Sequence, residues 1–271
     1  MKQSQAKKRD NAMTNKILMG LIALVLGLLF LEILIVHSKN EQQKNASNQI
    51  QTARIMANGD LLYHDGLYMS ALQADGSYDF TENFTYVKPW LKQADLVLGD
   101  FEGTINPDYP LSGYPLFNAP QSVTAAIKDA GYDVMDLAHN HILDSGLEGA
   151  FTTADAFKEV GIDPIGVYEK PVRDKAPLLI KNVNGIKVAI LSYAYGYNGL
   201  ESNLTDKEVA DHLSNLDEKR MKAEIQRAEK EADITVIMPQ MGVEYRLEPT
   251  DEQVKLYHKM IDWGADIIFG G

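Results

Sequence analysis

Acidic and histidine side chains follow three successive apolar runs of the sequence, each where a run ends. The candidates are Asp60 and His64 after the first run, Asp100 and Glu102 after the second, and Asn140, His141 and Asp144 after the third. Carboxylates, an amide oxygen and imidazoles together suit Mn²⁺, Fe or Zn²⁺, and a carboxylate between two ions can bridge them. The pattern predicts a metal site that activates water for attack, with a histidine outside the metal shell as proton donor.

The elements that must position these residues alternate between short β-rich runs and helical stretches. Predicted strands are Ala53–Gly59, Asp95–Gly99, Asp133–Ala138, Leu178–Val183, Lys187–Tyr193, Ile234–Pro239 and Ala265–Phe269. Predicted helices are Gln121–Ala130, Gly146–Val160, Leu216–Ala232 and Asp251–Gly264, the last opening with a capping box of Thr250 and Gln253. This alternation predicts an α/β fold with largely parallel strands, whose carboxyl ends gather ligands at one edge.

Each candidate also has a purely structural interpretation. Gly59-Asp60 is typical of a turn after a strand, because glycine tolerates positive φ and aspartate caps the next helix. Asp144 is equally suited to cap the helix predicted from Gly146. The repetition at three successive strand ends favours a shared metal site over three unrelated turns, since adjacent parallel strands lie only about 4.8 Å apart.

An apolar segment near the N-terminus predicts a membrane anchor. Residues 17–31 are fifteen consecutive apolar or glycine positions, and the run resumes after Glu32 to Val36. Twenty residues at about 1.5 Å each span a bilayer core of about 30 Å. A cleaved signal peptide is the alternative, but its apolar region is usually about 7–15 residues and ends at small side chains. Here His37-Ser38-Lys39-Asn40 follows instead, which favours a retained single transmembrane helix.

The charges around this segment predict its orientation. Residues 1–16 carry five basic side chains and one acidic side chain, which places this tail in the cytoplasm by the positive-inside rule. Residues 37–52 are polar and rich in Gln and Asn, as expected of a stalk, and residues 53–271 then form an extracytoplasmic domain. The chain is therefore expected in the cell membrane as a single-pass protein.

Composition excludes several classes of function. The chain has no cysteine, so disulfide frameworks, thiolate metal sites and cysteine nucleophiles are absent. Its formal net charge is −12, and the part after residue 36 carries 21 basic and 36 acidic residues, which argues against a nucleic-acid partner. The sequence has no Gly-x-Ser-x-Gly nucleophile elbow, no Gly-Lys-Ser/Thr phosphate loop and no Gly-x-Gly-x-x-Gly fingerprint, which excludes the common serine hydrolases, P-loop proteins and dinucleotide-binding enzymes.

Four segments carry a resemblance to a known family. They are Gly59-Asp60, residues 94–102 (ADLVLGDFE), residues 138–146 (AHNHILDSG) and residues 241–245 (MGVEY). Together they resemble the CapA/PgsA family of poly-γ-glutamate capsule synthesis proteins, which is related to calcineurin-like metallophosphoesterases. The resemblance covers the chain from about Arg54 to Gly271. It implies a metallophosphoesterase-like, layered sheet-and-helix domain, held outside the cell by an N-terminal anchor.

The resemblance also implies roles for individual residues. Asp60 matches the metal ligand of the first strand, Asp100 the bridging carboxylate, Asn140 the ligand of the third strand and His141 the general acid, with Asp144 beside it. His64 matches a further ligand less closely, because it follows the aspartate by four positions and not by two. Glu102, Gln240 and Glu244 are expected to line the site.

Two departures from the family pattern bear on activity. Gln240 stands where the family often has a histidine, and an amide is a poorer ligand for transition metals than imidazole. The chain ends at Gly271, where related enzymes continue into a His-x-His segment that completes the metal shell. The sequence is therefore expected to be truncated, with an impaired metal site.

These observations predict a membrane-anchored, extracytoplasmic protein of poly-γ-glutamate capsule biosynthesis with a metal-dependent, phosphoesterase-like hydrolase site. The bond cleaved is a phosphoester, or an amide or other bond of the polymer. The main alternative is a non-catalytic scaffold or export subunit of a membrane polymer synthase, and a third is a secreted phosphodiesterase unconnected with capsule. The expected partners are the cell membrane, synthase subunits and an anionic polymer.

Overall fold

The computed structural model describes residues 28, 31–39 and 50–271. The chain divides into two compact units, residues 1–51 and 52–271, and residues 31–39 of the first unit are helical. The predicted cytoplasmic tail (1–16) lies outside the described residues, as do most of the predicted membrane segment (17–36) and stalk (37–52). Within the described ranges, no helix is both long enough and apolar enough to cross a bilayer.

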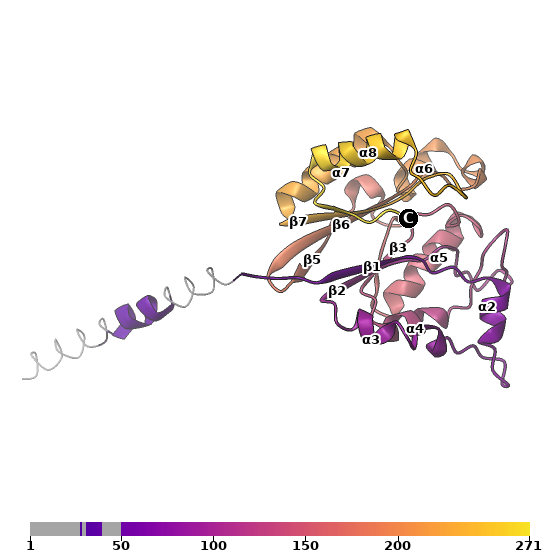
Figure 1. Cartoon of the computed structure of the whole chain (residues 1–271), viewed down its shortest axis with the longest axis horizontal. Helices are drawn as coiled ribbons and strands as arrows, with labels where there is room; N and C mark the ends of the chain where they lie inside the picture. The colour runs from indigo at the N-terminus through magenta and orange to yellow at the C-terminus, as the bar shows by residue number, and fades with distance from the viewer. Residues whose placement is uncertain (1–27, 29–30, 40–49) are drawn as a thin grey trace, which may run out of the picture. The chain divides into compact units, whose positions relative to one another are not determined.

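The second unit is built on two four-stranded sheets (Figure 1). The first sheet has the order β1 (Ile55–Asp60), β2 (Leu96–Asp100), β3 (Val134–Asp136) and β4 (Asp163–Ile165), and all its strands are parallel. The second has the order β5 (Leu179–Val183), β6 (Ile186–Ala194), β7 (Ile234–Gln240) and β8 (Ile267–Ile268). There β5 and β6 are antiparallel, whereas β6, β7 and β8 are parallel.

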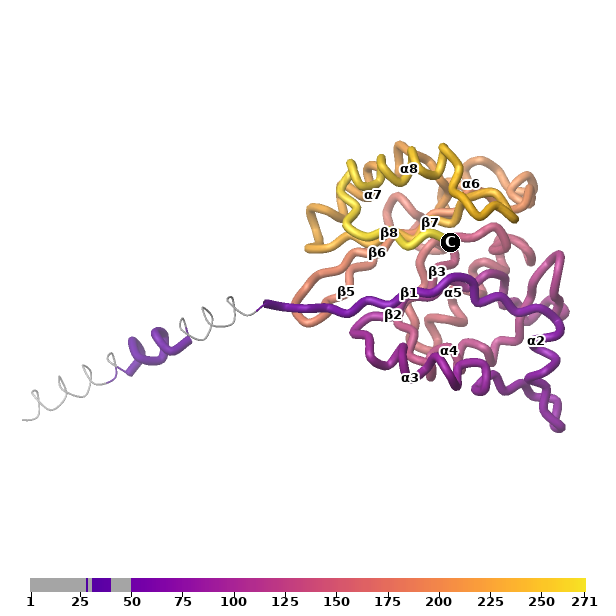
Figure 2. Tube along the Cα trace, viewed as in Figure 1, coloured from indigo at the N-terminus to yellow at the C-terminus, as the bar shows by residue number. Residues whose placement is uncertain are grey.

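Helices cover the outer face of each sheet. The first sheet packs on α4 (Val123–Ala130) and α5 (Gly146–Glu159), and the second on α7 (Glu218–Glu231) and α8 (Asp251–Trp263). Shorter helices are α2 (Asp65–Ser70), α3 (Lys88–Leu91), α6 (Asp206–His212) and the 3₁₀ turns Thr81–Phe84, Arg173–Lys175 and Leu200–Asn203. The layers therefore follow the order helix, sheet, sheet, helix (Figures 1 and 2).

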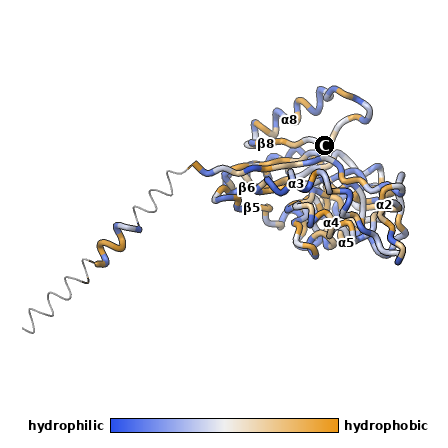
Figure 3. Tube along the Cα trace, turned by 60° about the horizontal axis from the view of Figure 1, so that its bottom comes forward, coloured by the Kyte–Doolittle hydropathy of each residue, from blue (hydrophilic) through white to orange (hydrophobic). Residues whose placement is uncertain are grey.

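Alternation of side chains along the strands explains this layering. In β2, Leu96 and Leu98 face the second sheet, whereas Val97 faces the α4 and α5 layer. In β6, Ile190 faces the first sheet and Leu191 faces α7 and α8. Because successive strand residues point to opposite faces, apolar strands such as these are buried on both sides. The helices show the complementary pattern, with hydrophilic and hydrophobic stretches alternating along α8 (Figure 3).

The seven predicted strands and four predicted helices are all present, with ends shifted by a few residues. The predicted capping box is confirmed: Thr250 Oγ1 accepts a hydrogen bond from the Gln253 backbone N–H, and Gln253 Oε1 accepts one from the Thr250 N–H. Strand β4 was missed because it has three residues and contains Pro164, which removes a backbone donor. The α/β class with largely parallel strands is confirmed.

A buried ion pair holds the turn after β4 against α7. Arg173, which is 3% exposed, donates from Nε and Nη2 to the two carboxylate oxygens of Glu224, both at 2.9 Å. Its Nη1 donates to the backbone oxygen of Leu213 and to Asn215 Oδ1. The guanidinium also lies over the ring of Tyr193, 5.6 Å from the centroid. Every face of this buried cation is therefore satisfied by the protein.

Arg173→Ala is expected to lower the free energy of unfolding by about 3 kcal/mol, because it leaves the partly buried Glu224 carboxylate without its cation and removes the fully buried guanidinium. Denaturant unfolding followed by circular dichroism measures this loss. The matched control is Lys158→Ala on α5, where the lysine pairs with Asp155 in solvent. That change should cost less than about 0.5 kcal/mol. Equal losses in the two variants would contradict the role given to Arg173.

Candidate functional site

Three aspartates lie side by side at the carboxyl end of the first sheet. The strand register pairs Asp60 of β1 with Asp100 of β2, and Asp100 with Asp136 of β3. An irregularity between Ala57 and Asp60 shifts the register of β1, as β-bulges commonly do next to functional sites. The prediction that Asp60 and Asp100 meet at one edge is confirmed. Asp136 was not among the predicted site residues.

Buried negative charge dominates the electrostatics of this edge. The Asp100 side chain is 4% exposed, and its Oδ1 has no hydrogen-bond partner among the described residues. Burial, and then the charges of Asp136, Asp60 and Glu102, raise its pKa well above the usual range. Burial and the adjacent Asp60 raise the pKa of Glu102 to about 8, and burial raises that of Asp136 to about 8. The cluster therefore favours any positive charge that enters it.

The residues at this edge fit a divalent cation. Carboxylate oxygens are hard anionic ligands, and Asp100 Oδ1 and Asn58 Oδ1 are buried acceptors without a donor, lining one cavity of about 300 Å³. Asp136 and Gln240 line the same cavity. In the part of the chain that the structure describes, no three His, Asp or Glu side chains have the arrangement of a metal site. The oxygen donors thus match a cation in their chemistry without forming a closed ligand cage.

Asn140 is fixed by two hydrogen bonds to the second sheet. Its backbone N–H donates to Gln240 Oε1 at 2.8 Å, and its Oδ1 accepts from Gln240 Nε2 at 3.0 Å. Its own Nδ2 donates to Asn198 Oδ1 at 3.2 Å, so the amide oxygen and nitrogen have distinct partners. One lone pair of Asn140 Oδ1 remains for a further ligand. Gln240, predicted to line the site, therefore orients the predicted ligand Asn140.

The loop that carries Asn140 has little freedom. His139 is fully buried, and its Nδ1 accepts a hydrogen bond from the His141 backbone N–H. Burial, and then the neighbouring His141, lower the pKa of His139 to about 3, so this ring is neutral. Gly166, at φ +94°, passes so close that an added Cβ would lie 2.6 Å from the Ala138 nitrogen. Only glycine fits there, and the loop is held from both sides.

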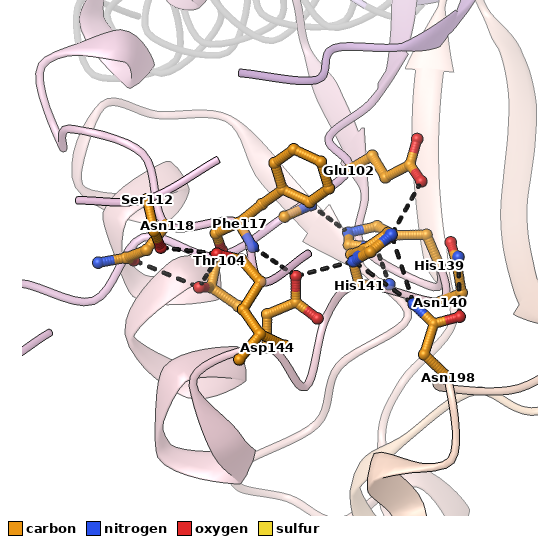
Figure 4. Close-up of polar contacts among 12 residues, drawn as sticks. Glu102, Thr104, Ser112, Phe117, Asn118, His139, Asn140, His141, Asp144 and Asn198 are labelled. Atoms are coloured by element: carbon orange, nitrogen blue, oxygen red, sulfur yellow. Dashed lines mark hydrogen bonds and ion pairs between the residues drawn. The ribbon is translucent and has the colours of Figure 1, made fainter. Parts of the chain in front are cut away.

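His141 and Asp144 form a hydrogen-bonded pair (Figure 4). His141 Nδ1 lies 2.8 Å from Asp144 Oδ2, which also accepts the Phe117 backbone N–H at 2.6 Å. On the other side of the ring, Nε2 lies 3.9 Å from a Glu102 carboxylate oxygen. Burial alone would lower the pKa of His141, but the hydrogen bond to Asp144 and the charges of Asp144, Glu102 and Glu244 raise it. These neighbours therefore favour the protonated form of the His141 ring.

The remaining candidates lie at the margin of the cluster. His64 is exposed, and its ring packs edge-on against the Phe117 ring. Phe117 makes a second edge-on contact with the ring of His141. Glu244 lines an open cleft of about 500 Å³ together with Asp60, Glu102, Asn140 and Gln240. His64 is absent from the described residues that line this cleft. Its assignment as a metal ligand stays a prediction.

Besides Asn58, which lines the cavity beside Asp100, two further site residues were missed by sequence reasoning. Asp136 lies within the apolar run Val134–Ala138. A charged residue inside a buried strand is uncommon, and this alone could have marked Asp136 as a candidate site residue. Asn198 has a left-handed backbone with φ of 53°, and its Nδ2 lies 3.3 Å from His141 Nε2. Only the fold reveals the contact of Asn198, because 57 positions separate it from His141.

Asp144→Asn is expected to lower the pKa of His141 by about 1 or more, because the paired carboxylate favours the protonated ring. In the native protein this pair stabilises the fold below a pH of about 6.5, and the contribution declines as the pH rises through the raised pKa. Nuclear magnetic resonance of the imidazole nitrogens against pH measures both values. Glu148→Gln, on the exposed side of α5, is the control and should leave the titration unchanged. An unchanged titration in Asp144→Asn would refute the pairing.

Comparisons with known proteins agree with this architecture. The family model for "Bacterial capsule synthesis protein PGA_cap" matches residues 54–271. The chain is 33% identical over 196 residues to the capsule biosynthesis protein CapA of Bacillus anthracis, covering 69% of this chain and 47% of that protein. It is 27% identical over 266 residues to the PGA biosynthesis protein CapA of Bacillus subtilis, covering 97% and 68%. The chain thus spans about half the length of the first relative.

A solved structure shares the fold. A putative 5′-nucleotidase from Staphylococcus aureus superposes with a TM-score of 0.51 at 14% identity, over 81% of this chain and 45% of that protein. The layered sheets and helices of this chain accordingly have the same fold as that protein. The family model, which covers every strand from β1 to β8, settles the relationship. The chain belongs to the PGA_cap family of bacterial capsule synthesis proteins.

Proposed function

We propose that this chain is a membrane-anchored, extracytoplasmic component of poly-γ-glutamate capsule synthesis with a metal-dependent hydrolase site. The observation that carries the proposal is the buried Asp100 carboxylate, which lies between Asp60 and Asp136 and has one oxygen to which no described residue donates a hydrogen bond. An uncompensated carboxylate at the carboxyl edge of parallel strands is where an α/β protein binds its ligand. The family membership supplies the biological setting.

Three residues are proposed to hold the cation. Asp60 and Asp100 offer carboxylate oxygens, and Asn140 offers the free lone pair of its amide oxygen. When bound, a divalent ion supplies an activated water and neutralises negative charge that develops on the substrate. Asp136 lies beside Asp100 on β3, and a bound cation would favour the ionised form of its carboxyl group. Among the metals expected from the sequence, Mn²⁺, Fe and Zn²⁺, this set of oxygen ligands suits Mn²⁺ best.

His141 is proposed to donate a proton to the leaving group. Asp144 accepts the Nδ1 proton, so Nε2 is the atom left to exchange a proton with a substrate. Nε2 points toward Glu102, which lines the open cleft (Figure 4). The raised pKa of His141 keeps a larger fraction of the ring protonated near neutral pH, as a general acid requires. The reaction proposed is hydrolysis of a phosphoester or of an amide bond of the polymer.

The cleft itself selects against anions in the absence of a cation. Asp60, Glu102, Glu244 and Glu248 line it, with Arg246 as the one basic side chain among its described lining residues. An anionic polymer brought to this cleft would be repelled by the excess of carboxylates over the single basic side chain. A bound divalent ion would reverse the local sign of the charge. Metal binding and polymer binding are therefore proposed to be coupled.

A second candidate function is a non-catalytic scaffold or export subunit of a polymer synthase. The specific observation in its favour is the pair of hydrogen bonds between Gln240 and Asn140. Gln240 Nε2 occupies one lone pair of the Asn140 oxygen, and an amide replaces an imidazole at that position. In this alternative the polar cluster acts as a structural link between the two sheets.

A measurement of metal binding distinguishes a metal site from a purely structural polar cluster. Saturating Mn²⁺ or Zn²⁺ is expected to raise the melting temperature of the full chain in detergent by about 5–10 °C, because a ligand that binds only the folded state stabilises it. Asp100→Asn should abolish this shift while raising the melting temperature of the metal-free protein, since it removes a repelled charge. Asp108→Asn, in the exposed loop after β2, is the control and should keep the wild-type shift. A metal shift that survives in Asp100→Asn would overturn the metal site.

Capsule production separates catalysis from scaffolding. His141→Ala, placed in the chromosomal gene, is expected to lower the rate of the hydrolytic step by about 10²- to 10⁴-fold and to reduce cell-surface poly-γ-glutamate accordingly. Immunoblotting verifies that the variant accumulates to the wild-type level. Glu148→Gln serves again as the control, with normal polymer expected. Normal polymer in both His141→Ala and Asp100→Asn cells would favour the scaffold function.

A further inference from the structure

Three large apolar or aromatic side chains are exposed together around helix α3. Tyr86 is 88% exposed, Val87 45% and Trp90 65%, and we call these three residues the α3 patch. Tyr86 and Val87 lie in the turn that leads into α3, and Trp90 lies within the helix, so the three exposed side chains fall within five consecutive positions. Leu91, in contrast, points into the core. An exposed group of this kind marks an interaction surface more often than single apolar residues do.

The α3 patch lies where the chain enters the second unit. Arg54 Nη1 donates to the Gln93 backbone oxygen, and the Arg54 backbone N–H donates to Asp95 Oδ2. The segment that follows Trp90 is thereby tied to the residue immediately before β1, three positions after the boundary at Gln51. A membrane anchor that precedes residue 52 would therefore join the domain on the side that carries the α3 patch.

Charge distinguishes this side from the rest of the domain. Residues 85–93 (TYVKPWLKQ) contain two lysines and no acidic residue, within a part of the chain that has 36 acidic and 21 basic residues. Lys88 pairs with Asp129, and Lys92 is exposed. Tryptophan, tyrosine and lysine together are the residues that settle at the boundary between lipid headgroups and water.

The length of the predicted stalk permits contact with lipid. Residues 37–52 reach at most about 55 Å when fully extended, at about 3.5 Å per residue. A domain of about 220 residues has a radius of gyration of about 17 Å and hence a diameter of about 45 Å, so the stalk keeps it within little more than one domain diameter of the bilayer. At that distance a weak surface contact is favoured by high effective concentration.

We propose that the α3 patch docks on the outer surface of the lipid bilayer, with the rings of Tyr86 and Trp90 at the level of the headgroups. The proposal rests on the membrane anchorage proposed above. Docking also orients the site, because β1 starts beside the patch-bearing segment and ends at Asp60, which points the acidic cleft away from the lipid. Six residues of strand place the cleft about 20 Å farther from the bilayer than the start of β1.

Fluorescence of Trp90 tests this contact directly, since the chain has two tryptophans. The full chain carrying Trp263→Phe is reconstituted into vesicles of phosphatidylcholine and phosphatidylglycerol, with or without bromine on the acyl chains. Docking predicts that brominated lipid lowers the Trp90 emission by about half, because an interfacial tryptophan lies next to the acyl chains. Tyr86→Asp in the same background should restore the emission, whereas Tyr109→Asp, on an exposed loop after β2, should not.

Flotation of the vesicles after an alkaline wash separates the two proposals. A chain that does not float refutes the membrane anchor and the docking with it. A chain that floats while its Trp90 emission is indifferent to bromine keeps the anchor and overturns the docking. An emission shifted to shorter wavelength but indifferent to bromine means that a second copy of the chain covers the patch, which also overturns docking on lipid.

Discussion

Everything at the candidate site depends on one constraint: parallel strands in register bring carboxylates together where water is scarce. The pairing of β1 with β2 and of β2 with β3 places Asp100 between Asp60 and Asp136, whatever the cost of repulsion. Two like charges about 4 Å apart repel by about 4 kcal/mol at an effective dielectric constant of 20. The fold sustains this only by leaving protons on the carboxylates, as their raised pKa values show, or by admitting a cation.

The second sheet shapes this cluster as much as the first. Gln240, at the end of β7, accepts a hydrogen bond from the Asn140 backbone N–H and donates one to the Asn140 side-chain oxygen. Asn198, after β6, contacts both Asn140 and His141. The apolar layer between the sheets, with Leu98 of β2 and Val236 of β7 fully buried, sets the separation at which these amides meet. The site is therefore a property of the packed pair of sheets, and neither sheet contains it alone.

The sequence predicts the parts of the site that follow from strand ends. Asp60, Asp100 and Asn140 stand directly after apolar runs, so parallel pairing was enough to bring them to one edge. Asp136 was not predicted because it lies inside its apolar run and not after it. The sequence does not show which face of the sheet a side chain within a fully buried strand takes. Asn198 escaped because its contact with His141 depends on how the loop after β6 crosses to the first sheet. The division into two sheets could not be predicted either, since alternating strands and helices are equally compatible with a single sheet.

The direction of β1 links the chemistry of the site to the location of the protein. The strand begins beside Arg54, where the chain enters the domain, and ends at Asp60, so the acidic cleft and the start of the domain lie at opposite ends of the first sheet. About 20 Å of strand separates them, which exceeds twice the Debye length of about 8 Å at physiological salt. Anionic headgroups at the start of the domain would therefore be screened at the cleft. In the proposed membrane-bound arrangement, the charge that the polymer would meet at the cleft is set by Asp60, Glu102 and any bound cation.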